Sequence, residues 1–226
     1  MTYVLRANVR GLPRRNILTD YLGLTWCGKN IHPAHLVTTD TRVRIFQFKV
    51  THNTLYLNTR LVHLGHSENP LCSLCNNFNE TPSHLFCECH ITVALWRELI
   101  VFFSPAITLD PITPQSALLG FFNVNDDTFL LRNYILLLFK YFIYKNRKNT
   151  INFHSIIRFF KSVCEVEKSI YPVEKFEIKW STIIHLFVWS YTYVFFCIVV
   201  LAVDLKWKLI QKKKRKINNK KVLILE

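Results

Sequence analysis

Apolar residues recur at helical spacing over residues 41–65, with basic and other polar residues between them. Asp40 stands directly before this pattern, where a helix N-cap is expected, and Gly65 closes it, where a helix C-cap is expected. The segment therefore predicts one bent helix or two short helices that end at Gly65. The apolar positions are Val43, Phe46, Val50, Leu55 and Leu61.

A second helical pattern lies further along the chain, in residues 91–103. Leu95, Leu99 and Phe103 share one stripe of this segment, which predicts an amphipathic helix. Residues 105–114 follow it with three prolines, and this composition indicates a loop.

Two long helical patterns complete the series. Residues 129–148 are mostly apolar and interrupted by Arg132 and Lys140, which predicts a buried central helix with a basic C-terminal end. Residues 153–169 predict a second amphipathic helix, and five glycines in 226 residues leave little room for glycine-rich loops or repeated hairpins. The pattern predicts an all-α fold. The apolar stripe of the last helix comprises Ile156, Ile157, Phe160, Val163 and Cys164.

The C-terminal region differs in kind. Residues 182–203 contain no Asp, Glu, Lys or Arg, and a helix of this length would cross a bilayer. The segment is a candidate transmembrane helix, or else an accidental sequence that was never selected as protein. A true span would place the protein in a membrane, with the basic body translocated and the basic tail in the cytoplasm; otherwise we expect the nucleus or cytoplasm.

We divide the chain into a poorly patterned N-terminal remnant (1–39), a helical region (40–181), the apolar segment (182–203) and a polybasic tail (204–226).

The formal net charge of +14 is concentrated in that tail. Lys206–Lys221 holds nine Lys and Arg residues and no acid, which leaves a mildly basic body of +5. A basic body is suited to phosphate contacts, although a solvated helix face explains such charges equally well. The candidate contacts to RNA or DNA are Arg42, Arg44, Lys49 and Arg60.

Four of the seven cysteines lie between Cys72 and Cys89. An odd number of cysteines without a secretory signal disfavours a disulfide framework and favours a metal site. Cys72, Cys75, His84 and Cys89 form a C-x2-C-x8-H-x4-C set, whose soft and borderline donors fit a tetrahedral zinc ion. Such a small zinc knuckle (72–89) between helices would be closed by four protein ligands and would leave no position for a catalytic water.

The fourth ligand has two candidates. Thr81 and Pro82 mark the N-cap and first residue of a short helix. On an ideal helix Cys87 lies about 60° around the axis from His84, and Cys89 lies about 140° from it. Spacing alone therefore favours Cys87, and Cys89 can bind only if the helix stops or unwinds after residue 86.

His66 and His90 are expected to be surface histidines. The alternative to a metal site is a group of buried thiols with one satisfied histidine.

Several ordered blocks between residues 40 and 181 resemble the zinc-binding region that follows the reverse transcriptase domain in LINE-type, non-LTR retrotransposons. These blocks are Asp40-Thr41-Arg42, Phe46-Gln47-Phe48-Lys49, Leu57-Asn58-x-Arg60-Leu61, Leu71-Cys72-x2-Cys75, Glu80-Thr81-x2-His84-Leu85-Phe86 with Cys89, Leu95-Trp96, Leu119-Gly120, residues 133–145 and Lys179-Trp180. The resemblance implies Cys89 as the fourth ligand. It also implies a truncated element copy, because the likeness fades after Ser181.

The function that the resemblance implies is a non-catalytic helical module that helps a polymerase grip template RNA or target DNA. Polymerase chemistry requires carboxylates that hold two metal ions, normally in an aromatic-x-Asp-Asp turn. Asp126-Asp127 is the one Asp-Asp pair in the sequence, and we interpret it as the cap of the next helix. We therefore expect no enzyme activity and no small-molecule substrate, with a zinc knuckle followed by a helical bundle.

Overall fold

The computed structural model describes residues 34–109, 112–121 and 128–187. The chain divides into two units after Trp180, and the helices α2 to α8 belong to the first unit. Helices dominate the described residues, among which the β-pairing is one isolated bridge between Leu71 and Asn79. The predicted all-α fold is confirmed. The helices are α2 (Ala34–Val37), α3 (Thr41–Thr51), α4 (Asn58–His63), the π-helical turn η1 (His84–Glu88), α5 (His90–Phe103), α6 (Pro114–Leu119), α7 (Phe129–Asn146) and α8 (Phe153–Ile170).

The segment 41–65 forms two short helices, so the second of the two sequence alternatives is correct. Asp40 is the N-cap of α3, and its Oδ1 accepts a hydrogen bond from the Arg42 backbone N–H at 2.8 Å. The chain leaves α3 through Asn53, whose φ of 51° breaks the helix, and enters α4 after Leu57. Gly65 follows α4 with a φ of 71°, the left-handed conformation that glycine favours at a helix end.

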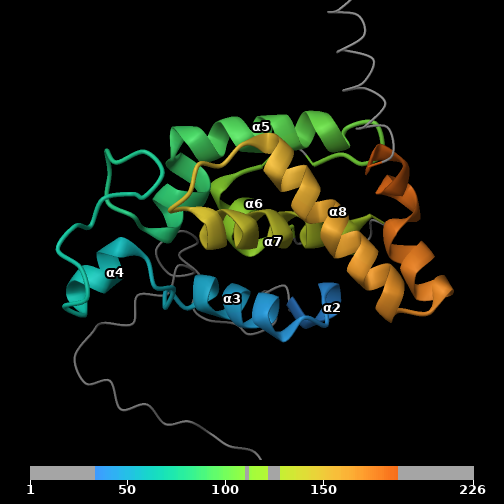
Figure 1. Ribbon diagram of the computed structural model, residues 1–226, viewed down its shortest axis with the longest axis horizontal. Helices are drawn as coiled ribbons and strands as arrows, with labels where there is room; N and C mark the ends of the chain where they lie inside the picture. The colour runs from blue at the N-terminus through green and yellow to red at the C-terminus, as the bar shows by residue number, and fades with distance from the viewer. Residues whose placement is uncertain (1–33, 110–111, 122–127, 188–226) are drawn as a thin grey trace, which may run out of the picture. The chain divides into compact units, whose positions relative to one another are not determined.

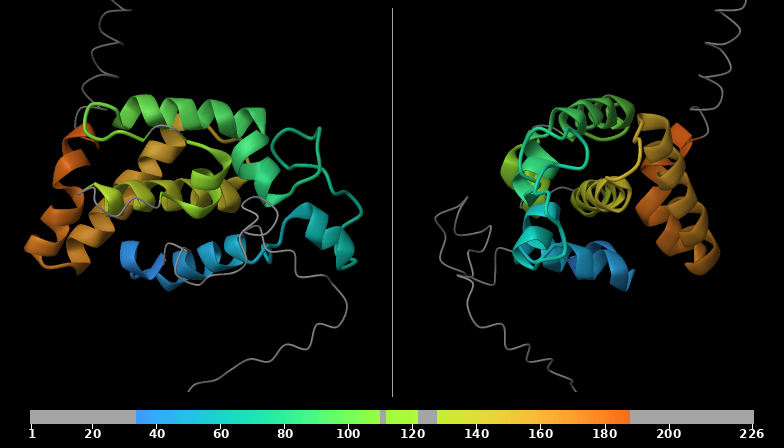
Figure 2. Two further views of the ribbon diagram at one scale, coloured as in Figure 1. Left: turned by 180° about the vertical axis from the view of Figure 1, so that it is seen from behind. Right: turned by 60° about the vertical axis from the view of Figure 1, so that its left-hand side comes forward.

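Helix α7 is the centre of the fold. Twelve of its 18 residues are buried, and α2, α3 and α8 all contact it. In Figures 1 and 2 it lies between α5 on one side and α2 and α3 on the other. Aromatic rings fill both junctions: Trp96 of α5 lies 4.0 Å from Phe139 between ring centroids, and Phe46 of α3 lies 5.4 Å from Tyr144. The predicted buried central helix is confirmed, because an apolar surface on every side requires neighbours on every side.

The two amphipathic helices pack by their predicted stripes. Leu95, Leu99 and Phe103 of α5 are buried, and Phe103 meets Phe160 of α8 at 5.6 Å between ring centroids. On α8 four predicted stripe residues are buried, whereas Val163 is half-buried. The C-terminal turn of α8 places Glu167 in the core, where its carboxylate accepts from three side chains. These donors are Tyr134 Oη at 2.7 Å, Lys179 Nζ at 2.9 Å and Trp180 Nε1 at 2.7 Å.

Helix α6 was missed by the sequence pattern, which indicated only a loop before α7. Thr113 is its N-cap, Pro114 is its first residue, and the Ser116 hydroxyl completes a capping box. Its end depends on Gly120, whose φ of 94° and ψ of −179° belong to a region that is essentially restricted to glycine. The Asn133 side chain of α7 lies directly against this glycine, and its Oδ1 accepts from the Phe121 N–H at 2.8 Å.

A polar cluster lies inside the junction of α3, α6 and α7. The Lys140 side-chain amine donates to Gln47 Oε1 at 2.9 Å and to the Leu118 carbonyl at 2.8 Å. Gln47 Nε2 donates to the same carbonyl at 3.0 Å. Because burial disfavours the charged form, the pKa of Lys140 is lowered to about 7. A lysine that only interrupted the apolar pattern in the sequence is therefore a core residue.

Other sequence predictions fall partly or wholly outside the described residues. The N-terminal remnant is described only from residue 34, where α2 begins, and the polybasic tail lies outside altogether. Asp126 and Asp127 also lie outside the described residues, so their predicted role as a helix cap stays a prediction. Thr128, which directly precedes α7, makes no side-chain cap hydrogen bond. Helical backbone covers residues 173–187, which include the first six residues of the predicted span; the remainder lies outside the described residues. In the described parts of the chain, no helix has the length and apolar composition that a bilayer crossing requires.

Candidate metal centre

The first pair of donor residues lies on a tight turn. The Leu71–Asn79 bridge closes residues 71–79 into a small loop, and the Cys72 N–H donates to the Phe78 carbonyl at 2.7 Å. Within the loop the Asn76 N–H donates to the Cys72 carbonyl at 2.9 Å, and Asn76 has a φ of 55°. This turn brings the thiols of Cys72 and Cys75 to the same side of the loop.

The second pair lies on η1 and directly after it. The Thr81 hydroxyl accepts from the His84 N–H at 3.1 Å, so Thr81 caps this helical segment as predicted. The turn is π-helical, and the Cys89 N–H donates to the His84 carbonyl at 2.7 Å. In a π-helical turn, with its i→i−5 bond, residue 89 lies about one turn after residue 84 and on nearly the same side of the axis. In an α-helix, residue 89 would lie about 140° around the axis from residue 84. The helix is unwound at the place where the Cys89 alternative requires it.

The four predicted donor residues come together, with their ligand atoms all within 4.8 Å of one another. Cys75 Sγ and His84 Nε2 are 3.2 Å apart. Zinc–sulfur bonds of about 2.3 Å in a tetrahedron imply donor separations near 3.8 Å. Three thiols and one imidazole at this spacing fit a zinc ion, and Cys72, His84 and Cys89 are buried while Cys75 is half-buried.

Cys87 lies outside this group of donors. Its thiol faces the Pro114 carbonyl, with Sγ 3.8 Å from the oxygen. Burial raises the pKa of Cys87 to about 12, so this thiol holds its proton at neutral pH.

Cys89 has the opposite electrostatic environment. A hydrogen bond from the Cys72 thiol is the main cause that lowers the pKa of Cys89, and the backbone N–H groups of Thr92 and Ile91 in the first turn of α5 contribute to the same lowering. The same contact raises the pKa of Cys72. Zinc binds thiolates, so a sulfur at a helix N-terminus that releases its proton easily is a suitable ligand.

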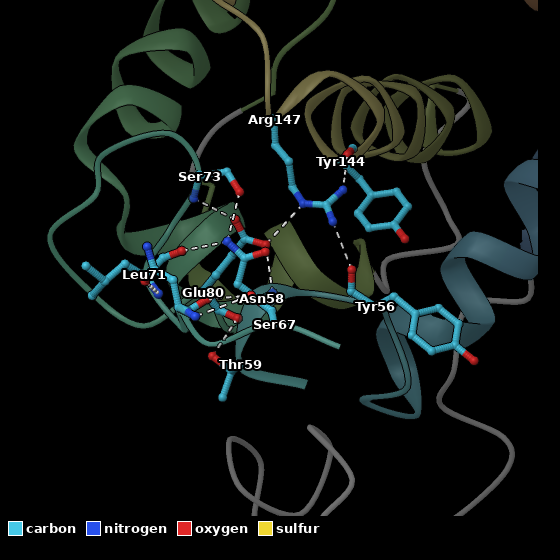
Figure 3. A network of polar contacts seen from close by, with 10 residues as sticks. Tyr56, Asn58, Thr59, Ser67, Leu71, Ser73, Glu80, Tyr144 and Arg147 are labelled. Carbon is cyan, nitrogen blue, oxygen red and sulfur yellow. Dashed lines mark hydrogen bonds and ion pairs between the residues drawn. The ribbon is translucent and has the colours of Figure 1, made fainter. Parts of the chain in front are cut away.

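A buried carboxylate connects this loop to the helices around it. Glu80 is 0% exposed, and Figure 3 shows its side chain at the centre of a polar network. Glu80 Oε2 accepts from the Ser73 N–H at 2.7 Å, between the two cysteines of the first pair. Glu80 Oε1 accepts from the Asn58 N–H and from Arg147 Nε, each at 3.1 Å. The network thus joins the loop to the start of α4 and to the residue that follows α7.

Arg147 extends this network to a third place. Its Nη1 donates to the Tyr144 carbonyl at 2.7 Å and its Nη2 donates to the Tyr56 carbonyl at 2.9 Å (Figure 3). Its guanidinium also lies 4.5 Å from the centroid of the Tyr144 ring. Each nitrogen of this guanidinium therefore has a defined partner, which fixes the end of α7 against the loop before α4.

Trp96 supports the π-helical turn from α5. Its Nε1 donates to the Phe86 carbonyl at 2.8 Å, and both side chains are buried. The last carbonyls of a helix lack partners within that helix. The indole therefore satisfies a carbonyl that the unwound turn would otherwise leave unpaired beside Cys89.

The four basic residues predicted to contact nucleic acid have different partners in the structure. Arg42 is exposed and pairs with Asp40 at 3.0 Å, and Arg44 Nε donates to the Thr38 carbonyl at 2.7 Å. Lys49 and Arg60 share a neighbour, because both lie over the ring of Tyr56, at 5.3 and 5.8 Å from its centroid. Arg60 Nη1 also donates to the Asn53 carbonyl at 3.1 Å.

Sequence reasoning noted Glu80 and Trp96 only as part of a motif and missed the role of Arg147. An isolated acid four residues before His84 and a basic residue at the end of a predicted helix were visible signals. Nothing in the sequence indicated that these residues, 67 positions apart, form an ion pair.

Comparison with protein families finds that residues 26–96 match a family described as zinc-binding in reverse transcriptase. The matched segment contains all four donor residues, Glu80 and Trp96. The donor geometry and this match confirm the predicted zinc cofactor and the resemblance to a reverse transcriptase zinc-binding region. No curated protein matches the chain, and no solved structure matches it.

Proposed function

We propose that the chain is a non-catalytic nucleic-acid-binding module, in which a zinc ion bound by Cys72, Cys75, His84 and Cys89 stabilises a basic surface. Its origin would be the region after the polymerase domain of a LINE-type retrotransposon, preserved as a truncated copy. The observation that carries the proposal is the closed set of four protein donors, preceded in the chain by residues 41–67, which contain no Asp or Glu.

The donor set supports a structural role for zinc. Four protein ligands fill the tetrahedron, so no coordination position remains for water or substrate. Structural zinc sites contribute on the order of 10–16 kcal/mol of apparent binding free energy to the folding of the segment that holds them. Zinc would act here by fixing the knuckle, and Glu80 would transmit that rigidity to α4 and the end of α7.

The charge distribution supports nucleic acid as the partner. Residues 41–67 contain four Lys and Arg residues and no Asp or Glu. The exposed Lys145 and Lys148 add positive charge at the end of α7, which Arg147 holds against Tyr56. Phosphates of RNA or DNA are the polyanions that such a surface attracts through release of counterions.

Metal content tests the zinc assignment. The full chain and its Cys72→Ser, Cys87→Ser and Cys89→Ser variants would be purified and measured by elemental mass spectrometry. We expect one tightly held zinc per chain in the parent and in Cys87→Ser, and loss of zinc in the other two variants. A folded parent without zinc, or loss of zinc with Cys87 alone, contradicts the ligand set.

Salt-dependent binding tests the nucleic-acid assignment. We expect the parent to bind a labelled oligonucleotide at low salt, and Lys49→Gln or Arg60→Gln to lower the slope of log K against log salt by about one. Lys168→Gln, on the exposed side of α8, is the matched control for loss of one charge. The basic tail is identical in every variant, so it cannot produce a difference between them. If the parent fails to bind the oligonucleotide at every salt concentration tested, the proposal is contradicted.

A further inference from the structure

The geometry of α3 and of the loop after it points to a more specific partner, single-stranded nucleic acid whose bases stack on Phe48 and Tyr56. This inference rests on the proposed function and adds a preference between strand types. The surface concerned comprises Phe48, Lys49, Tyr56 and Arg60, and is called the aromatic–basic surface below.

Phe48 lies on the outer side of α3. The helix buries Val43, Phe46 and Val50 against the fold, whereas Phe48 remains 60% exposed. Its ring contacts only a neighbour on the same helix among the ring contacts described, His52 at 4.1 Å between centroids. Among the ring contacts of the described residues, Phe48 has no partner from another helix, and much of its ring is exposed to solvent.

Tyr56 is the second exposed ring, and the polar network holds its backbone. Its side chain is 47% exposed, while its carbonyl accepts from Arg147. Figure 3 shows the ring pointing away from Glu80 and Arg147, with the backbone oxygen turned toward the guanidinium. The loop 52–57 is folded onto α3 through the Thr54 N–H, which donates to the Lys49 carbonyl at 2.8 Å. The ring therefore has a defined place beside α3.

Two cations accompany these rings. Lys49 follows Phe48 directly in α3 and places its ammonium group over the ring of Tyr56, and Arg60 reaches the same ring from α4. A groove that binds single strands combines aromatic platforms for the bases with cations for the phosphates. The surface has both elements, and no acid occurs within residues 41–67 to repel the backbone.

Charge also argues against the chain's own N-terminal segment as the occupant. Residues 1–33 contain five Lys and Arg residues and one Asp, so their charge has the same sign as that of the surface. Like charges disfavour such a contact, whereas a polyanion is complementary.

A duplex does not fit this surface equally well. Bases in a duplex are stacked on one another and expose only their edges, and their faces reach a protein ring only after unstacking. A single strand offers the base faces directly, and stacking on an aromatic side chain contributes roughly tenfold or more in affinity for each base. The expected preference is for single strands, with little dependence on sequence.

The test uses fluorescence anisotropy of the full chain with labelled 12-nucleotide RNA and DNA of mixed sequence, each as a single strand and as a duplex. We expect the parent to bind the single strands about tenfold more tightly than the duplexes. Phe48→Leu keeps an apolar side chain but removes the aromatic face, and we expect it to lose about tenfold for single strands and to change duplex binding by less than about twofold. Phe48→Trp keeps an aromatic face and should retain the parent affinity.

Val101→Ala, at an exposed position of α5, is the control for loss of exposed apolar surface. Tyr56→Leu repeats the test at the second ring and serves if Phe48→Leu does not fold. Equal binding of single strands and duplexes, or unchanged affinity in Phe48→Leu, overturns the inference and leaves the proposed function standing. Absence of binding to all four probes overturns both.

Discussion

Replacement of Glu80 by glutamine removes one negative charge from the centre of the fold and keeps the shape of the side chain. Both carboxylate oxygens accept from donors: Oε1 from Asn58 N–H and Arg147 Nε, and Oε2 from Ser73 N–H. A glutamine amide must place its NH2 group where one of these oxygens stood. In either orientation, two donors then face each other inside the protein.

The expected cost follows from burial. The Glu80 side chain is 0% exposed and that of Arg147 is 11% exposed, so solvent screens this pair little. Removing one partner of a buried ion pair costs about 3–5 kcal/mol, because the other charge remains unpaired. We expect Glu80→Gln to lower the free energy of unfolding by about 3 kcal/mol, and Tm by roughly 6–12 °C for a protein of this size.

Urea unfolding of the zinc-loaded full chain, followed by circular dichroism, measures this effect. Glu98→Gln is the matched control, because Glu98 is exposed on α5 and its replacement should change stability by less than about 0.5 kcal/mol. The double variant Glu80→Gln/Arg147→Met should be more stable than the sum of the two single losses implies, since the second change removes the unpaired guanidinium.

A zinc titration separates stability from metal affinity. Ser73 lies between the two cysteines of the first pair, so loss of its contact to Glu80 should lower the affinity for zinc about 10- to 100-fold, as for other groups that orient metal ligands. If Glu80→Gln unfolds and binds zinc like Glu98→Gln, the buried carboxylate does not stabilise the knuckle, and the reasoning from burial and donor geometry is wrong.

Three further changes test other contacts. Trp96→Phe leaves the Phe86 carbonyl without its donor, and we expect the free energy of unfolding in urea to fall by about 1–3 kcal/mol. The affinity for zinc, measured in competition with a chelator, should fall as well. Gly120→Ala places a Cβ in steric overlap with Asn133 Oδ1 at a φ of 94°, and should cost about 2–4 kcal/mol in the same assay; an unchanged unfolding midpoint would show that the turn relaxes freely. Lys140→Met tests pH dependence. Because the pKa of Lys140 is about 7 in the fold against 10.5 when unfolded, the unfolded chain binds more protons between these values, and this residue makes stability rise with pH. From pH 7 to 9 the parent should therefore gain more stability than Lys140→Met, and parallel profiles would contradict the burial of an uncharged amine.

The helices were predictable wherever one face is apolar and the other polar. Residues 91–103 and 153–169 have stripes that are typical of a helix, and the residues of these stripes are buried, apart from Val163. Thr92, Trp96 and Glu167 are buried as well, outside the predicted stripes. Helix α6 was not predictable in this way, because its four buried residues in a row, 116–119, give no alternation to detect. Its start was visible in Thr113 and Pro114, a typical N-cap followed by proline at the first position.

The donor residues could be selected from the sequence, but the geometry that joins them could not. Spacing on an α-helix favours Cys87, and the structure instead turns Cys87 toward Pro114 and brings Cys89 to His84. The difference arises from a π-helical turn supported by Trp96, a residue from the next helix. Helical propensity describes neighbours along the chain, so a hydrogen bond from ten residues away is outside its reach.

The physical need for a metal follows from the burial pattern around the knuckle. From residue 58 to residue 84 the buried side chains are those of Cys72, Glu80, Pro82 and His84. A segment of this length with so little apolar core cannot offset its loss of conformational entropy by hydrophobic burial. Two of the four buried residues are zinc donors and a third carries the network to Arg147, so metal coordination and the buried charge replace the missing core. Since Arg147 also holds Tyr56, removal of zinc should loosen the aromatic–basic surface together with the knuckle, and chelation should weaken single-strand binding without any change in the residues of that surface.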